Sequence, residues 1–149
     1  MYTWTEKRSI VEQIEQVRPL RRTLAEIMDF QHERLLERYR ESTGTSLEWA
    51  ARCFNAFKQF MIVCAVKPGY KVTSDPIDQM WHTFLLFTRD YRMFCEDNLG
   101  RFINHEPFEQ AYPSAYVETR AFANEYFGEL DEEFWNLDAK ADCSSGCYE

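Results

Sequence analysis

The chain has 149 residues, of which 45% are hydrophobic and 28% charged, and this length and composition are typical of one globular domain. Its formal net charge of −8 disfavours nucleic acid and anionic membrane surfaces as partners. The longest apolar run, residues 60–66, is far shorter than the roughly 20 residues that cross a bilayer, so we expect no membrane-spanning segment. The N-terminus does not resemble a signal peptide, and the sequence therefore predicts a soluble, cytoplasmic protein.

Helical periodicity dominates the first half of the chain. It predicts a short helix over residues 10–17 and a longer one over residues 20–39. A third helix is predicted over residues 47–64, with Ser46 as its N-cap. Apolar residues occupy more than one face of this third helix, so we expect it to be buried at the centre of the molecule.

The clearest helix start in the chain is the tripeptide Ser74-Asp75-Pro76. Ser74 or Asp75 can cap the helix, and Pro76 suits its first turn because a helix leaves the N–H groups of that turn unpaired. The apolar stripe that follows predicts a helix over residues 76–85. Apolar spacing predicts later helices over residues 88–95, 115–127 and 131–135.

No segment alternates between polar and apolar residues for long enough to indicate a β-strand. The sequence therefore predicts an all-α fold, a compact orthogonal bundle of five to seven helices with an irregular C-terminal tail. We expect a single helical domain over residues 1–137 and an acidic, cysteine-containing tail over residues 138–149. Acidic residues gather towards the C-terminus, since residues 118–149 hold nine Asp and Glu against two Lys and Arg.

Asp78 and His82 form the first candidate site, because residues four apart on a helix lie on one face about one turn apart. Their row continues into the apolar Leu86, so we expect the pair to be partly buried and to need polar partners. A bound cation would satisfy both side chains. The alternative is a local structural pair near a helix N-terminus, where an Asp complements the helix dipole.

His105 follows the predicted helix that contains residues 88–95 and is expected in a loop. It is either a third ligand or a histidine that bridges groups within that loop. Two imidazoles and one carboxylate, from Asp78, His82 and His105, are the ligand set of non-haem iron oxygenases and also suit catalytic zinc. Zn or Fe is therefore the predicted cofactor. His32 stands among polar residues of a predicted helix, where we expect a solvated face and no ligand role.

Five cysteines complete the inventory of candidate ligands. Cys143 and Cys147 are four residues apart, and their thiolates are further candidate ligands of the same metal. The alternatives are a reduced tail and an oxidisable pair. Cys53 and Cys64 fall on apolar stripes and are expected in the core, as is Cys95, although it shortly precedes His105.

Three strings, at residues 76–82, 88–95 and 100–105, resemble the uncharacterised helical domain at the front of plant glycine-rich domain-containing proteins. Small stand-alone bacterial chains are similar to that domain too, and the similarity is clearest over residues 54–107. The resemblance implies no established activity. It implies that the signature positions are Asp78, Trp81, His82, Tyr91, Cys95 and His105. The sequence has only five glycines, so roles that depend on a glycine-rich segment are not carried over.

Two functions are compatible with these observations. The first is a small metal-binding helical protein whose partner is a small molecule, a protein or a peptide. The sequence indicates neither a reaction nor an oligomeric state for it. The second is a metal-free helical interaction module in which Asp78, Trp81 and His82 are structural. The aromatic content of 16% could supply a contact surface for such a module.

Overall fold

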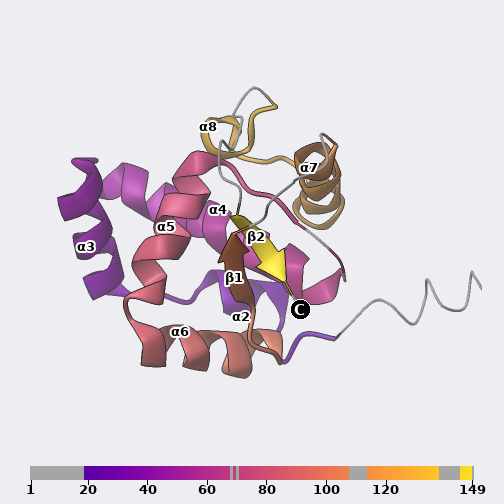
Figure 1. Ribbon diagram of the computed structural model, residues 1–149, viewed down its shortest axis with the longest axis horizontal. Helices are drawn as coiled ribbons and strands as arrows, with labels where there is room; N and C mark the ends of the chain where they lie inside the picture. Colours follow the sequence, from indigo (N-terminus) through magenta and orange to yellow (C-terminus); the bar gives the residue numbers. More distant parts are fainter. Residues whose placement is uncertain (1–18, 68, 70, 108–113, 138–144, 149) are drawn as a thin grey trace, which may run out of the picture.

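The structure is a computed structural model that describes residues 19–67, 69, 71–107, 114–137 and 145–148. The helix predicted over residues 10–17 lies outside this part of the chain. Figure 1 shows that helices make up most of what is described. In chain order the elements are α2 (Leu24–Met28), α3 (Glu33–Thr43), α4 (Leu47–Val66), α5 (Asp75–Leu85), α6 (Thr88–Phe94), the π-helical turn η1 (Cys95–Leu99), β1 (Asn104–Pro107), α7 (Ala115–Phe127), α8 (Glu132–Trp135) and β2 (Ser145–Tyr148).

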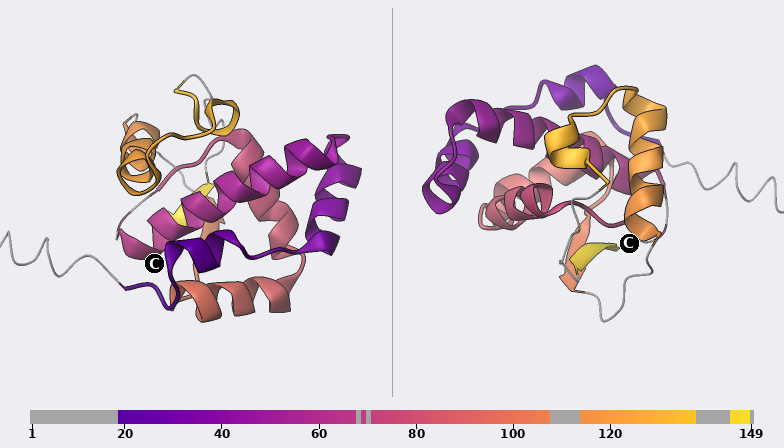
Figure 2. Two further views of the ribbon diagram at one scale, coloured as in Figure 1. Left: turned by 180° about the vertical axis from the view of Figure 1, so that it is seen from behind. Right: turned by 90° about the horizontal axis from the view of Figure 1, so that it is seen from above.

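The central element is α4, as the sequence predicts. Its start is fixed by Ser46, whose hydroxyl oxygen accepts the N–H of Trp49 at 3.1 Å. Thirteen of its twenty residues are buried, because α2, α3, α5, α7 and α8 all contact it. Figures 1 and 2 show α7 and α8 on one side of α4, with α2 and α6 on the opposite side. The all-α fold class is confirmed.

One predicted helix is wrong, because residues 20–39 are not continuous but form α2 and α3 with a break between them. Thr23 begins α2 with a capping box that pairs it with Glu26. Phe30 lies in the break and inserts its ring into the core, where the ring centroid of Phe94 is 4.9 Å away and that of Phe54 6.1 Å away. A continuous helix would not present Phe30 to both rings, so core packing overrides the local periodicity.

The prediction that His32 occupies a solvated face is also wrong. His32 is the N-cap of α3, and its Nδ1 accepts the backbone N–H of Leu35 at 3.1 Å. Its Nε2 lies 2.8 Å from Oδ2 of Asp90, and the side chain is only 12% exposed. His32 therefore caps the first turn of α3, and its contact with Asp90 joins the start of α3 to α6.

Lys58 is a buried cation on α4 that the sequence does not single out. Its ammonium donates to the carbonyl oxygens of Met28 at 2.5 Å and of Phe30 at 2.8 Å. These carbonyls belong to the end of α2 and the following break, which leave backbone acceptors unpaired. Burial lowers the pKa of Lys58 to about 8.

The elements that carry the candidate site begin with α5, which starts after Ser74 and has Pro76 in its first turn, as predicted. The Ser74 hydroxyl makes no capping hydrogen bond. Thr88 is the first residue of α6, and Phe87 occupies its N-cap position. After η1 the chain turns at Gly100, whose φ of 79° lies in the left-handed region that favours glycine.

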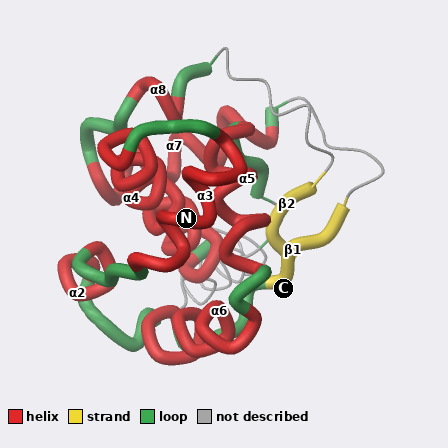
Figure 3. The backbone as a smooth tube through the Cα atoms, turned by 90° about the vertical axis from the view of Figure 1, so that its left-hand side faces the viewer, coloured by secondary structure: helices red, strands yellow, loops and turns green. Residues whose placement is uncertain are grey.

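Two short strands form an antiparallel ribbon that the sequence does not predict. Asn104 pairs opposite Tyr148, and His105 pairs opposite Cys147. Figure 3 shows this ribbon at one edge of the helical assembly. Four residues are too few to display a period of two, and the partner strand is distant in the sequence. No helix in the described part of the chain has the length and apolar character that crossing a membrane requires.

Candidate metal centre

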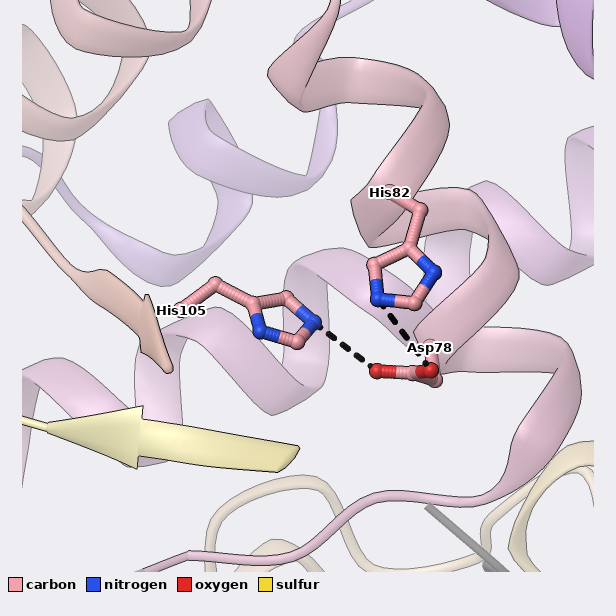
Figure 4. A group of neighbouring side chains, drawn as sticks. All are labelled: Asp78, His82 and His105. Atoms are coloured by element: carbon pink, nitrogen blue, oxygen red, sulfur yellow. Dashed lines mark hydrogen bonds and ion pairs between the residues drawn. The ribbon is translucent and has the colours of Figure 1, made fainter. Parts of the chain in front are cut away.

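Asp78, His82 and His105 converge at one place in the fold. Asp78 and His82 come from successive turns of α5, and His105 comes from β1 (Figure 4). The Nε2 atom of His105 lies 2.9 Å from Oδ1 of Asp78, and the Nε2 atom of His82 lies 3.5 Å from Oδ2. One ligand atom from each residue falls within 4.8 Å of the other two. The spatial grouping that the sequence predicts for these three residues is therefore present.

These separations suit one bound ion. Protein ligands bind zinc at about 2.0–2.2 Å, so neighbouring ligand atoms around one ion are about 2.9–3.6 Å apart. The contact to Oδ1 of Asp78, at 2.9 Å, and the contact to Oδ2, at 3.5 Å, fall in this range, and one ligand atom from each of the three residues lies within 4.8 Å of the others. Figure 4 shows both imidazole rings directing a nitrogen at the carboxylate from different sides. The donor set, two imidazole nitrogens and one carboxylate, fits a divalent transition metal.

The three side chains differ in their exposure to solvent. The side chain of Asp78 is 8% exposed and that of His105 is 5% exposed, whereas that of His82 is 55% exposed. A carboxylate charge at a buried position needs a close counter-charge or strong hydrogen bonds. The exposed side of His82 leaves the centre accessible from solvent, which is where water or another ligand can reach an ion.

Trp81 supports His105 from the interior. Trp81 lies on the buried face of α5, and its ring centroid is 4.0 Å from that of His105. The indole N–H of Trp81 donates to the hydroxyl oxygen of Tyr91 at 3.0 Å. The Tyr91 hydroxyl in turn donates to the backbone carbonyl of Ile103, two residues before His105. The resemblance pointed to Trp81 and Tyr91, but their contacts with one another were not predicted.

The cysteines of the helical core do not belong to the group of side chains that could hold the ion. Cys53, Cys64 and Cys95 are buried, as predicted, and none of the three forms a disulfide. Burial raises the pKa of Cys95 to about 11 and that of Cys53 to about 12. These two thiols therefore stay protonated near neutral pH in the metal-free protein.

Of the two tail cysteines, Cys147 belongs to the part of the chain that the structure describes. Cys143 lies outside the described residues. The backbone of Cys147 belongs to β2, where the register puts this residue opposite His105. His32 belongs to a different cluster, since its partners are Leu35 and Asp90.

Comparisons with known proteins bear on the family and not on an activity. Neither a search of curated proteins nor a search of solved structures finds a match to this chain. The model of the UCP032817-like family matches residues 12–140, which include the whole of the candidate centre and most of the chain. The chain therefore belongs to the UCP032817-like family.

Proposed function

We propose that this protein binds a divalent transition metal, zinc or iron, through Asp78, His82 and His105. The convergence of the three side chains from two separate elements supports the proposal most strongly. Helical spacing alone would bring Asp78 and His82 together. The third group comes from a strand far along the chain, and its ring nitrogen lies 2.9 Å from the same carboxylate.

The type of site follows from its ligands and its exposure. Two imidazoles and one carboxylate leave coordination positions free, and His82 is more than half exposed on the open side. A metal bound there would supply Lewis acidity or an activated water. Asp78 and His105 would hold the ion from the buried side, while His82 would border the entry. The partner class that fits such an entry is a small molecule or a protein or peptide segment, and the proposal names no reaction.

Cys147 is the tail cysteine that we propose as a further ligand. Residues directly opposite one another on antiparallel strands have the closest Cβ atoms across the ladder, and Cys147 is opposite His105 in the register. A thiolate in the fourth position would close the site and favour a structural zinc. Cys143 stays a candidate on its spacing in the sequence alone.

Metal quantification of the untagged protein tests the proposed function. Wild-type protein, stripped with chelator and reloaded with zinc, should retain about one equivalent after desalting. His82→Ala and His105→Ala should each reduce the retained zinc. His32→Ala is the matched control, because it removes a histidine that contacts a carboxylate elsewhere in the chain and should leave zinc content unchanged. Absence of stoichiometric metal from both freshly isolated and reloaded wild-type protein would refute the proposal.

Cobalt substitution separates the open site from the closed one. A thiolate bound to Co²⁺ gives a sulfur-to-cobalt charge-transfer band in the near ultraviolet, which imidazole and carboxylate ligands do not give. If Cys147 is a ligand, Cys147→Ser should abolish this band and Cys143→Ser should not. A cobalt spectrum without the band in wild-type protein would leave Asp78, His82 and His105 as an open site and refute the role of Cys147.

A metal-free interaction module is the second candidate function. Its supporting observation is a set of exposed apolar side chains on and around α6. Their exposed fractions are 66% for Leu86, 51% for Met93 and 43% for Phe102. In that case Asp78, Trp81 and His82 would be structural, a partner would co-purify, and His82→Ala would leave metal content unchanged.

We also propose that the family is related to the front domain of the plant glycine-rich domain-containing proteins. The strings at residues 76–82, 88–95 and 100–105 support this relationship. They fall on α5, on α6 with the first residue of η1, and on the turn into β1 with its first two residues. We propose a cytoplasmic location because Cys53, Cys64 and Cys95 form no disulfide, which is typical of a reducing compartment.

A further inference from the structure

Tyr91 links the helix and the strand that carry the candidate ligands. Its hydroxyl accepts the indole N–H of Trp81 on α5 at 3.0 Å and donates to the backbone carbonyl of Ile103 just before β1. The exposed fractions are 0% for Trp81, 1% for Tyr91 and 3% for Ile103. One buried hydroxyl therefore joins α5 to the segment that leads into β1.

Both hydrogen-bond partners of Tyr91 lie next to His105. Ile103 is two residues before His105, so fixing its carbonyl fixes the entry of β1. Trp81 packs its ring against the imidazole of His105, with centroids 4.0 Å apart. His82 projects from α5 with its side chain 55% exposed and needs no such support, because the helix itself sets its position.

From this geometry we infer that Tyr91 is a positioning residue for the metal centre. It holds the imidazole of His105 beside Asp78, where both side chains can reach one ion, although it contacts neither the ion nor a ligand atom. This inference rests on the proposed metal-binding function. Groups that orient metal ligands typically change metal affinity by 10- to 100-fold when they are removed.

Tyr91→Phe is the direct test, because it removes the hydroxyl and keeps the ring that packs on Phe84 and Phe102. The variant leaves the indole N–H of Trp81 and the carbonyl of Ile103 buried without their shared partner. We expect zinc affinity, measured by competition with a chromophoric chelator, to fall about 10- to 100-fold. In NMR spectra of the variant, the imidazole resonances of His105 should shift or broaden, whereas those of His32 should stay unchanged.

Tyr116→Phe is the matched control. The hydroxyl of Tyr116, on α7, also donates to a backbone carbonyl, that of Asn136 at 2.9 Å. A general loss of stability would therefore affect both variants, whereas a positioning role affects zinc affinity only in Tyr91→Phe. Equal zinc affinity of Tyr91→Phe and wild type would overturn the inference, as would an equal loss in the two variants.

A measurement on the wild-type protein covers the case in which Tyr91→Phe does not fold. Coupling is reciprocal, so if the Tyr91 hydrogen bonds favour zinc binding, zinc must stabilise those hydrogen bonds. Zinc should slow the exchange of the Trp81 indole proton more than that of Trp135, whose indole N–H donates to Gln59 at 3.2 Å. Equal slowing of the two protons would overturn the inference.

The outcomes separate this inference from the proposed function. Wild-type protein that holds no stoichiometric metal, either as isolated or after reloading with zinc, refutes both. Wild-type protein that binds zinc while Tyr91→Phe binds it equally well refutes only the role of Tyr91. A selective loss of affinity in Tyr91→Phe, with Tyr116→Phe unchanged, supports both.

Discussion

The carboxylate of Asp78 and the imidazole of His105 lie 2.9 Å apart, between residues 27 positions apart in the sequence. Both side chains are less than a tenth exposed, so each depends on the other for part of its hydrogen bonding. This contact joins the start of α5 to β1. It therefore stabilises the metal-free protein, and this role can be measured separately from metal binding.

Removing the carboxylate should destabilise the metal-free protein. In Asp78→Ala the buried ring of His105 loses its partner, and an unpaired buried polar group costs about 1–3 kcal/mol. We expect a loss of that size in the free energy of unfolding, measured by urea denaturation in the presence of chelator. His82→Ala removes a half-exposed ring and should cost less than about 0.5 kcal/mol under the same conditions. Equal losses in the two variants would contradict this account of the Asp78–His105 pair.

His32 should be a stability residue and not a ligand. In His32→Ala the first turn of α3 loses its cap and Asp90 loses its partner, and loss of an N-cap side chain costs about 0.5–2 kcal/mol. Asparagine is itself a good N-cap residue, so His32→Asn should recover part of the loss. Thermal unfolding of the two variants measures the difference. The account of α3 is wrong if alanine and asparagine have the same effect or if zinc content changes.

The buried ammonium of Lys58 should make stability rise with pH in an alkaline window. Burial lowers its pKa to about 8, whereas an unfolded lysine titrates at about 10.4. Between these values the unfolded chain holds a proton that the folded chain has lost, so the free energy of unfolding increases with pH. Relative to Lys58→Met, wild-type protein should gain roughly 2–4 kcal/mol between pH 7.5 and pH 10.5.

The comparison with Lys58→Met isolates this effect. Raised pKa values of Cys53 and Cys95 act in the opposite direction above about pH 9, because their stabilisation is present at lower pH and is lost as pH rises. Both proteins contain these cysteines, so their contribution cancels in the difference between the two denaturation curves. A difference that is flat or that falls with pH would contradict the placement of Lys58.

The core thiols should be unreactive in the folded protein. Cys53 and Cys95 have no exposed surface, and burial raises their pKa values to about 12 and about 11. Iodoacetamide at pH 8, followed by peptide mass spectrometry, should alkylate them only after unfolding in urea. Alkylation of Cys95 in native protein at the rate of an unfolded control would show that the packing around Tyr91 is not as described.

Much of the fold was predictable because its signals are local. Ser46 and Pro76 mark the starts of α4 and α5, and the predicted range 115–127 coincides with α7. The break between α2 and α3 was not predictable in this way. Phe30 lies between the two helices and packs against Phe94, which is distant in the sequence. The pattern of residues 20–39 alone does not indicate this contact.

The candidate site likewise has one part that local spacing predicts and another that depends on tertiary contacts. Helical spacing is enough to group Asp78 with His82, since both lie on α5. The approach of His105 depends on β1, whose pairing with β2 joins distant parts of the chain. The hydrogen bonds of Tyr91 are likewise tertiary. The residue types of the site could thus be named from the sequence, but the distances between them could not.

Crystallographic anomalous scattering at the zinc edge, on zinc-loaded wild-type protein, tests the central claim most directly. We predict one strong peak at about 2.0–2.2 Å from the Nε2 atoms of His82 and His105 and from a carboxylate oxygen of Asp78. A fourth contact to the thiolate of Cys147 would identify a closed site, and a bound water would identify an open one. No peak between these three side chains, or a peak only at other surface groups, would contradict the account.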